Sequence, residues 1–215
     1  MTRSDRITAL VTAPLAVALW AAGLAIANTP SVPDDATDAQ VLTWVHGHKN
    51  AILLGSWLFM TGCLAFLFFV GVLRSRLAAA EGEARTFTSI TFAAGVMMAV
   101  FGIGGQADIA SAINADTVSA ATAGTLHHAG DVMFVGAELC FTAFLVSVAV
   151  LSFRAAVLPR WWAVVGLLVA VVAYVGPIGW AALIFGLPVW LLVTTALLVR
   201  SASGSRVHAT VAEAV

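Results

Sequence analysis

The chain has 215 residues, of which 61% are hydrophobic and 10% are charged, and its net charge at pH 7 is −1. A soluble domain carries charge on roughly a quarter of its residues, so this composition excludes an ordinary soluble domain. The balanced charge also gives no indication of a nucleic-acid partner. The mean hydropathy of +1.00 indicates a chain whose solvent is membrane lipid.

Six apolar segments are each near the length of roughly 20 residues that crosses a bilayer as a helix. They predict an all-α polytopic membrane bundle of six transmembrane helices, in a single domain over residues 1–200. The fifth segment is short, and the GPIG turn at 176–179 predicts a tight hairpin before the sixth. Pro188 should kink the sixth helix or remove one of its backbone hydrogen bonds. The predicted helices cover about residues 7–27, 51–73, 87–109, 130–153, 161–175 and 180–199.

Three stretches outside the middle of these segments have patterns of their own. MTRSDR precedes the first segment, as in a signal peptide, but the apolar run is longer than the usual signal core of about 7–15 residues. We therefore expect a retained helix. Residues 28–50 form the longest predicted loop, where Asp38 can cap a short interfacial helix anchored by Trp44. Residues 201–215 are small and polar and predict a mobile cytoplasmic tail.

The arginines fall only in alternate connections, whereas the other connections contain one basic residue, Lys49. By the positive-inside rule, both termini and the loops after the second and fourth helices are cytoplasmic. This predicts a multi-pass protein of the cell membrane with both termini inside. The arginines are Arg3, Arg6, Arg74, Arg76, Arg85, Arg154, Arg160, Arg200 and Arg206.

The fourth segment begins with polar residues that an apolar run should avoid. His127, His128, Asp131 and Glu138 follow one another at spacings that place them on one face of a helix. The first three fall at the outer boundary, while Glu138 lies ten residues beyond His128, about 15 Å deeper. A carboxyl group at that depth should face the bundle and have a partner. We predict Glu138, Asp131 and His128 as catalytic candidates; the alternative is a structural bond from Glu138 to Ser56, Thr61 or Gln106.

Further polar side chains fall near the same boundary. Gln106 and Asp108 are two residues apart on the third helix, so only one of them can join Glu138 and Asp131. The pair His46 and His48 would chelate a metal only in an extended segment; otherwise these histidines serve as interfacial caps. The cofactor stays open, with a divalent metal such as zinc or copper among the options. The metal candidates are His46, His48, His128 and Asp131, and the remaining ligand-binding candidates are Gln106, Asp108, His127 and Tyr174.

Three stretches resemble a broad group of actinobacterial-type six-helix membrane proteins, the DUF4386-like group. They are LHHAGDVMF at the start of the fourth helix, LPRWWAVVGLLVAV at the fifth and LPVWLLVTTALLVR in the sixth. The resemblance covers about a third of the chain and implies the six-helix fold. No reaction is established for that group, so it implies no catalytic role.

Three functions fit these observations. The first is a small membrane enzyme or binder that takes an apolar or lipid-like molecule into an outward-facing polar pocket and uses acid/base chemistry. The second is a proton- or cation-coupled transporter or channel subunit, in which oligomerisation multiplies the short chain. The third is an accessory scaffold subunit of a membrane complex. The clustering of polar groups in the outer half favours the first, because a transporter needs access to both sides. Membrane lipid is the expected partner, and assembly as a homo-oligomer stays open.

Overall fold

The computed structural model describes residues 2–33, 35–175 and 178–212, with side chains through residue 200. All the regular structure in these ranges is helical, which confirms the predicted all-α class. In chain order the elements are α1 (Arg3–Ala27), α2 (Asp38–Glu81), α3 (Thr86–Gly104), α4 (Asp108–Ile113), α5 (Ala120–Ala155), α6 (Arg160–Tyr174), α7 (Gly179–Ala181), the π-helix η2 (Ala182–Gly186) and α8 (Leu187–Ala212).

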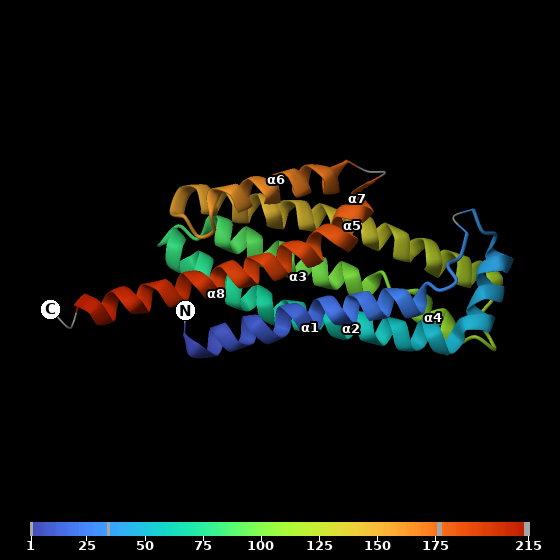
Figure 1. Ribbon diagram of the computed structural model, residues 1–215. Helices are drawn as coiled ribbons and strands as arrows, with labels where there is room; N and C mark the ends of the chain where they lie inside the picture. Colours follow the sequence, from blue (N-terminus) through green and yellow to red (C-terminus); the bar gives the residue numbers. More distant parts are fainter. Residues whose placement is uncertain (1, 34, 176–177, 213–215) are drawn as a thin grey trace.

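Five stretches of helix are long and apolar enough to cross a membrane, which makes this a multi-pass membrane protein. The six predicted spans need one correction, because α6 has only 15 residues and is therefore about 22 Å long. That length falls short of the hydrocarbon core of about 30 Å. The chain turns back through α7 before reaching the far end of the bundle (Figure 1).

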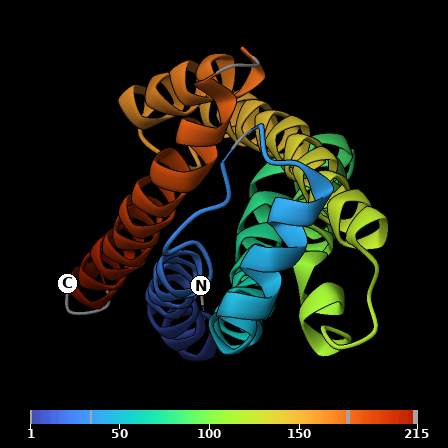
Figure 2. The same ribbon diagram turned by 90° about the vertical axis from the view of Figure 1, so that its right-hand side faces the viewer.

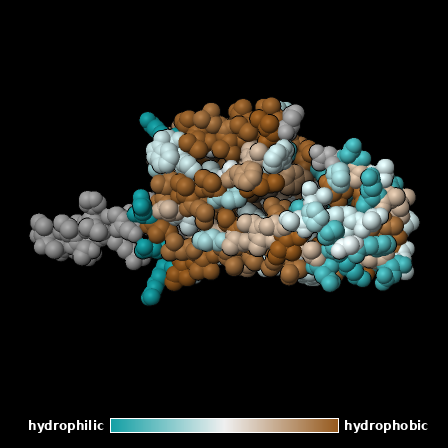
Figure 3. Space-filling view, turned by 45° about the vertical axis from the view of Figure 1, so that its right-hand side comes forward, coloured by the Kyte–Doolittle hydropathy of each residue, from teal (hydrophilic) through white to brown (hydrophobic). Residues whose placement is uncertain are grey.

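The long helices run side by side along one axis, and the two marked chain ends lie at the same end of the bundle (Figure 1). We call this the terminal end, and the opposite one the cap end. Seen from the cap end, α1 and α8 lie on one side and α3 and α4 on the other (Figure 2). The visible surface is hydrophobic along the helices and hydrophilic at the cap end (Figure 3), as expected for a band in lipid and a cap in water.

The described cap consists of loop residues 28–33 and 35–37, the first turns of α2, the short helix α4, and the first turns of α5. The short interfacial helix expected within residues 28–50 is the beginning of α2 itself, which starts at Asp38 and bends at His48 (φ −125°, ψ 17°). Trp44 fixes the preceding loop, since its indole Nε1 donates to the carbonyl of Pro30 at 2.8 Å. A small separate core holds the cap together: Val41, Val45, Ile52, Ala112, Ala115 and Ala123.

Glycines bring α1 and α2 into direct backbone contact. A methyl group on Gly23 would lie 2.7 Å from the carbonyl oxygen of Gly55, and one on Gly55 would lie 2.6 Å from that of Gly23. Farther along the same contact, Gly62 leaves room for the indole of Trp20. Small residues are typical of such close contacts between membrane helices, because the attraction there comes from packing.

The last helix begins irregularly. The π-helix η2 ends two residues before Pro188, and the N–H of Leu187 bonds five residues back to the carbonyl of Ala182. Proline has no N–H to give the carbonyl of Ile184, so the widened turn agrees with the expected disturbance. Beyond Arg200 the backbone continues as a helix to Ala212, where the sequence predicts a mobile tail. Residues 213–215 of that predicted tail lie outside the described residues.

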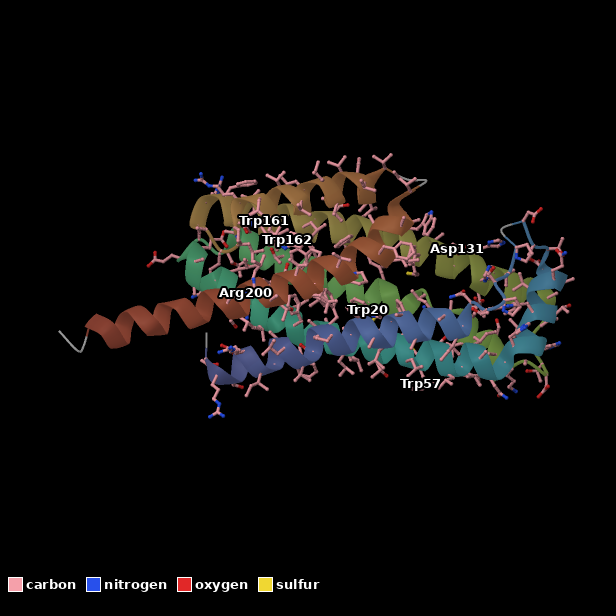
Figure 4. All side chains as sticks on the ribbon, viewed as in Figure 1. Trp20, Trp57, Asp131, Trp161, Trp162 and Arg200 are labelled. Atoms are coloured by element: carbon pink, nitrogen blue, oxygen red, sulfur yellow. The ribbon has the colours of Figure 1, made fainter. Side chains whose placement is uncertain are left out.

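Two neighbouring tryptophans at the start of α6 serve different purposes (Figure 4). Trp161 is exposed, whereas Trp162 is buried and its Nε1 donates to the hydroxyl of Thr194 at 2.8 Å. This bond joins α6 to α8. A tryptophan at a membrane boundary is thus not always an interfacial anchor.

We predict that Gly55→Ala lowers the free energy of unfolding by about 1–3 kcal/mol, because the new methyl group overpacks the contact with α1. Gly71→Ala in the same helix is the matched control, since its methyl group would meet no atom within 4 Å. That change should be neutral or stabilise the helix by up to about 1 kcal/mol. Unfolding in mixed micelles, followed by circular dichroism, measures both; equal stabilities would contradict the close contact.

Candidate functional site

One ion pair connects α4 to α5 in the cap. His127 Nδ1 lies 2.9 Å from Asp108 Oδ2, and both side chains are largely buried. The other carboxylate oxygen, Asp108 Oδ1, is buried without a hydrogen-bond partner in the described part of the chain, as is the hydroxyl of Ser111 one turn later. Of the two polar residues predicted at the end of the third helix, Asp108 therefore meets the fourth-segment histidines, but it pairs with His127 rather than with Glu138 or Asp131.

A second histidine–carboxylate pair is looser and faces water. His128 Nδ1 lies 3.7 Å from Asp131 Oδ2, and the two side chains are 63% and 71% exposed. Such exposed pairs contribute little to stability. With His127 and the loop residues Val32, Pro33 and Ala36, they line a pocket of about 280 Å³, which we call the cap pocket. Its small volume and exposed charges suit water and ions better than an apolar molecule.

The histidines of α2 bond to backbone carbonyls instead of meeting each other. His46 Nε2 lies 2.6 Å from the carbonyl oxygen of Ala115, and His48 Nδ1 lies 2.9 Å from that of Trp44. The segment is helical with a bend, so the extended HxH geometry required for chelation is not formed. Among the described residues, no group of three or more His, Cys, Asp and Glu side chains is placed to hold a metal ion. The four metal candidates, His46, His48, His128 and Asp131, are not assembled into one site.

Glu138 is buried, as its sequence position predicts, at 6% exposure. Its carboxylate lies against the first residue of α7: a methyl group on Gly179 would lie 2.7 Å from both Glu138 Oε2 and the carbonyl oxygen of Ala173. Only a residue without a side chain fits between them. In the described part of the chain, no hydrogen bond joins this carboxylate to the expected partners Ser56, Thr61 and Gln106; the hydroxyl of Thr61 instead donates to the carbonyl of Trp57.

The predicted site residues therefore do not share one outward pocket between the second, third and fourth helices. Glu138 follows Asp131 by seven residues, about 10 Å along α5, and faces Gly179 at the start of α7. Gln106 lies half-buried in the turn between α3 and α4. Tyr174 is 69% exposed at the end of α6 and lines neither the cap pocket nor the cavity described next. The catalytic candidates Glu138, Asp131 and His128 do not converge.

A larger cavity, which the sequence does not reveal, lies inside the bundle. Its volume is about 480 Å³, and Trp20 on its wall lies midway along the bundle, apart from Asp131 at the cap end (Figure 4). Helices α1, α2, α3 and α5 form one side, and η2 with the start of α8 forms the other. The lining residues are Val17, Trp20, Ala21, Leu24, Phe59, Cys63, Phe66, Met98, Ala99, Gly102, Phe134, Ala137, Leu183, Ile184, Phe185, Leu187, Pro188 and Val189.

The cavity is open on the side that faces lipid. Ala21, Phe185 and Val189 line it and are also exposed at the surface, so they form its rim between α1 and η2–α8. Comparison with family models, with curated proteins and with solved structures finds no match.

We predict that His127→Ala loosens the cap, because it leaves the largely buried carboxylate of Asp108 without its partner. Losing such a charged hydrogen bond should cost about 1–3 kcal/mol and accelerate amide hydrogen exchange in α4. His128→Ala is the matched control: its side chain is mostly exposed, and the change should stay within about 0.5 kcal/mol. Hydrogen exchange read by mass spectrometry tests this, and equal exchange in the two variants would refute a structural role for the His127–Asp108 pair.

Proposed function

We propose that this protein binds an apolar or lipid-like small molecule inside the membrane, in the cavity bounded by α1, α2, α3, α5 and η2–α8. The observation that supports this proposal is the size and apolar lining of the cavity. Its volume of about 480 Å³ lies within the roughly 300–1,000 Å³ of small-molecule sites, which are mostly apolar and largely preformed. A site of this kind, open toward lipid at Ala21 and Phe185, admits molecules that dissolve in the bilayer.

Binding is better supported than acid/base catalysis. A general acid or base must reach the reacting atom within hydrogen-bond distance or through one water. Among the described residues, no His, Asp or Glu lines the cavity. Asp131 and His128 belong to the cap pocket, and Glu138 faces Gly179. The residues expected to catalyse a reaction thus lie apart from the place where an apolar molecule fits.

Binding is also better supported than ion or proton transport. A proton or cation relay across the membrane needs a continuous series of polar groups that leads from Glu138 to the terminal end. Along α5 the next polar side chains are Thr142, Ser147 and Ser152, and each hydroxyl donates to the carbonyl four residues earlier. These hydroxyls bond within their own helix, and that of Thr142 also reaches the carbonyl of Ala170 on α6 at 3.4 Å. In the described part of the chain, no acidic or basic side chain lies on α5 between Glu138 and Arg154, and the ionisable group found there is the thiol of Cys140.

The proposed orientation places the cavity on the outer side. Both termini and the arginine-bearing connections lie at the terminal end (Figure 1), which the positive-inside rule assigns to the cytoplasm. The cap then faces outside. On α1 the cavity is lined by Val17 to Leu24, in the half of the helix nearer the cap, so the molecule would enter from the outer leaflet.

Photolabelling tests the proposal directly. We predict that a long-chain alkyl diazirine, irradiated with the protein in lipid nanodiscs, labels cavity residues such as Phe59 and Phe134. Ala21→Phe places a ring at the rim and should reduce that labelling at least several-fold. Ala18→Phe is the matched control: the same exchange at another exposed position of α1, outside the cavity lining.

Labelling confined to lipid-facing residues such as Leu54 and Phe68 would refute the proposal. So would cavity labelling that falls equally in Ala21→Phe and Ala18→Phe.

A further inference from the structure

The surface of the cavity is almost entirely hydrocarbon. Of its described lining residues, only Trp20, Cys63 and Met98 have a side-chain atom other than carbon. The Nε1 of Trp20 is buried against Gly62 and the Cys63 thiol, and Cys63 itself is only 2% exposed. Transfer of a charged group into such surroundings without a partner is very costly. The cavity therefore accepts hydrocarbon and excludes phosphate, carboxylate and ammonium groups.

Neither water nor empty space suits this cavity. A buried water needs about 2–4 polar partners, which the lining does not offer, and a void deprives the surrounding side chains of their dispersion contacts. The rim at Ala21, Phe185 and Val189 is exposed toward lipid. The apolar material that is most concentrated beside this rim is the acyl chains of the bilayer, so they have the first access to the cavity.

The cavity lies at the depth of the lipid chains in one leaflet. On α1 it is lined from Leu24, three residues before the helix ends at Ala27, down to Val17, ten residues before that end. These positions lie about 5 Å and 15 Å below the end of the helix. Half of the hydrocarbon core is also about 15 Å thick. A lipid chain that begins at the cap-side boundary therefore passes the cavity along its length.

The two ends of the cavity are marked by different residues. A methyl group on Gly23 would lie 2.7 Å from the backbone nitrogen of Phe59, so Phe59 lies at the level of Gly23, toward the cap end. Val17 precedes Gly23 by six residues and lies about 9 Å farther toward the terminal end. Both side chains are partly exposed, and a molecule in the cavity can touch them.

We propose that the occupant of the cavity is one acyl chain of a membrane phospholipid, which enters sideways over the rim at Ala21 while its headgroup remains in water beside the cap. This inference rests on the proposed function, because it assigns the class of molecule that the same cavity binds. A headgroup held at the boundary fixes the depth of the chain. The carbons near the ester then lie beside Phe59, and the end of the chain lies beside Val17.

Depth-resolved photolabelling tests the inference. Two phosphatidylcholines carry a diazirine in one acyl chain, either close to the ester or close to the end of the chain. Each is placed separately in phosphatidylcholine nanodiscs that contain the full-length protein, and the labelled residues are identified by mass spectrometry. We expect the ester-side probe to label Phe59 several-fold more than Val17, and the chain-end probe to label Val17 several-fold more than Phe59.

Two controls separate the cavity from the surrounding lipid. Ala21→Phe should reduce the labelling of Phe59 and Val17 by either phospholipid at least several-fold, whereas Ala18→Phe, outside the lining, should leave it unchanged. Phe68 is 63% exposed on the lipid-facing side of α2 and should be labelled equally in both variants. Its labelling shows that the variants are inserted and irradiated alike.

The failures are distinguishable. Identical labelling patterns from the two phospholipids would overturn the chain of fixed depth. So would cavity labelling by the free alkyl diazirine when neither phospholipid labels Phe59 or Val17; a free apolar molecule would then be the occupant, and the proposed function would stand. Failure of the alkyl diazirine and of both phospholipids to label the cavity would instead overturn the proposed function.

Discussion

The contact between α1 and α2 at Gly23 and Gly55 determines where the other helices leave space. Because the two backbones touch there, α1 is held at one side of the bundle, against α2 rather than in the centre. The face of α1 that carries Trp20 and Leu24 then looks across toward η2 and the start of α8. The helix is irregular just before Pro188, and η2 and the start of α8 do not pack closely against this face of α1. The cavity is the space between α1 on one side and η2 and α8 on the other.

The polar residues of the chain are arranged so that the membrane interior contains few groups without partners. His127 and Asp108 pair in the cap, and His46 bonds to a carbonyl of the same region. Trp162 and Thr194 satisfy each other between α6 and α8. Glu138 is the exception: its buried carboxylate occupies the space that Gly179 leaves by having no side chain.

The sequence could predict most of the helices and little of the site. Apolar length locates spans such as the one in α5, and the cost of a buried charge indicates that Glu138 lies inside. The cavity could not be predicted, because it depends on how segments as distant as Trp20 and Pro188 pack together. The polarity of the histidines also does not predict their partners: His46 bonds to the backbone carbonyl of Ala115, whereas His127 bonds to the carboxylate of Asp108. The shared helix face of His128, Asp131 and Glu138 predicted one site. One face of a long helix, however, contacts different elements at different positions along its length: His128 and Asp131 line the cap pocket, and Glu138 contacts Gly179.

A high-resolution structure of the protein in lipid nanodiscs tests the central claim most directly. We expect elongated density in the cavity between Phe59, Phe134 and Pro188. A cavity closed by movement of η2 onto α1, or one filled with ordered water, would contradict the account, because neither leaves a place for an apolar molecule.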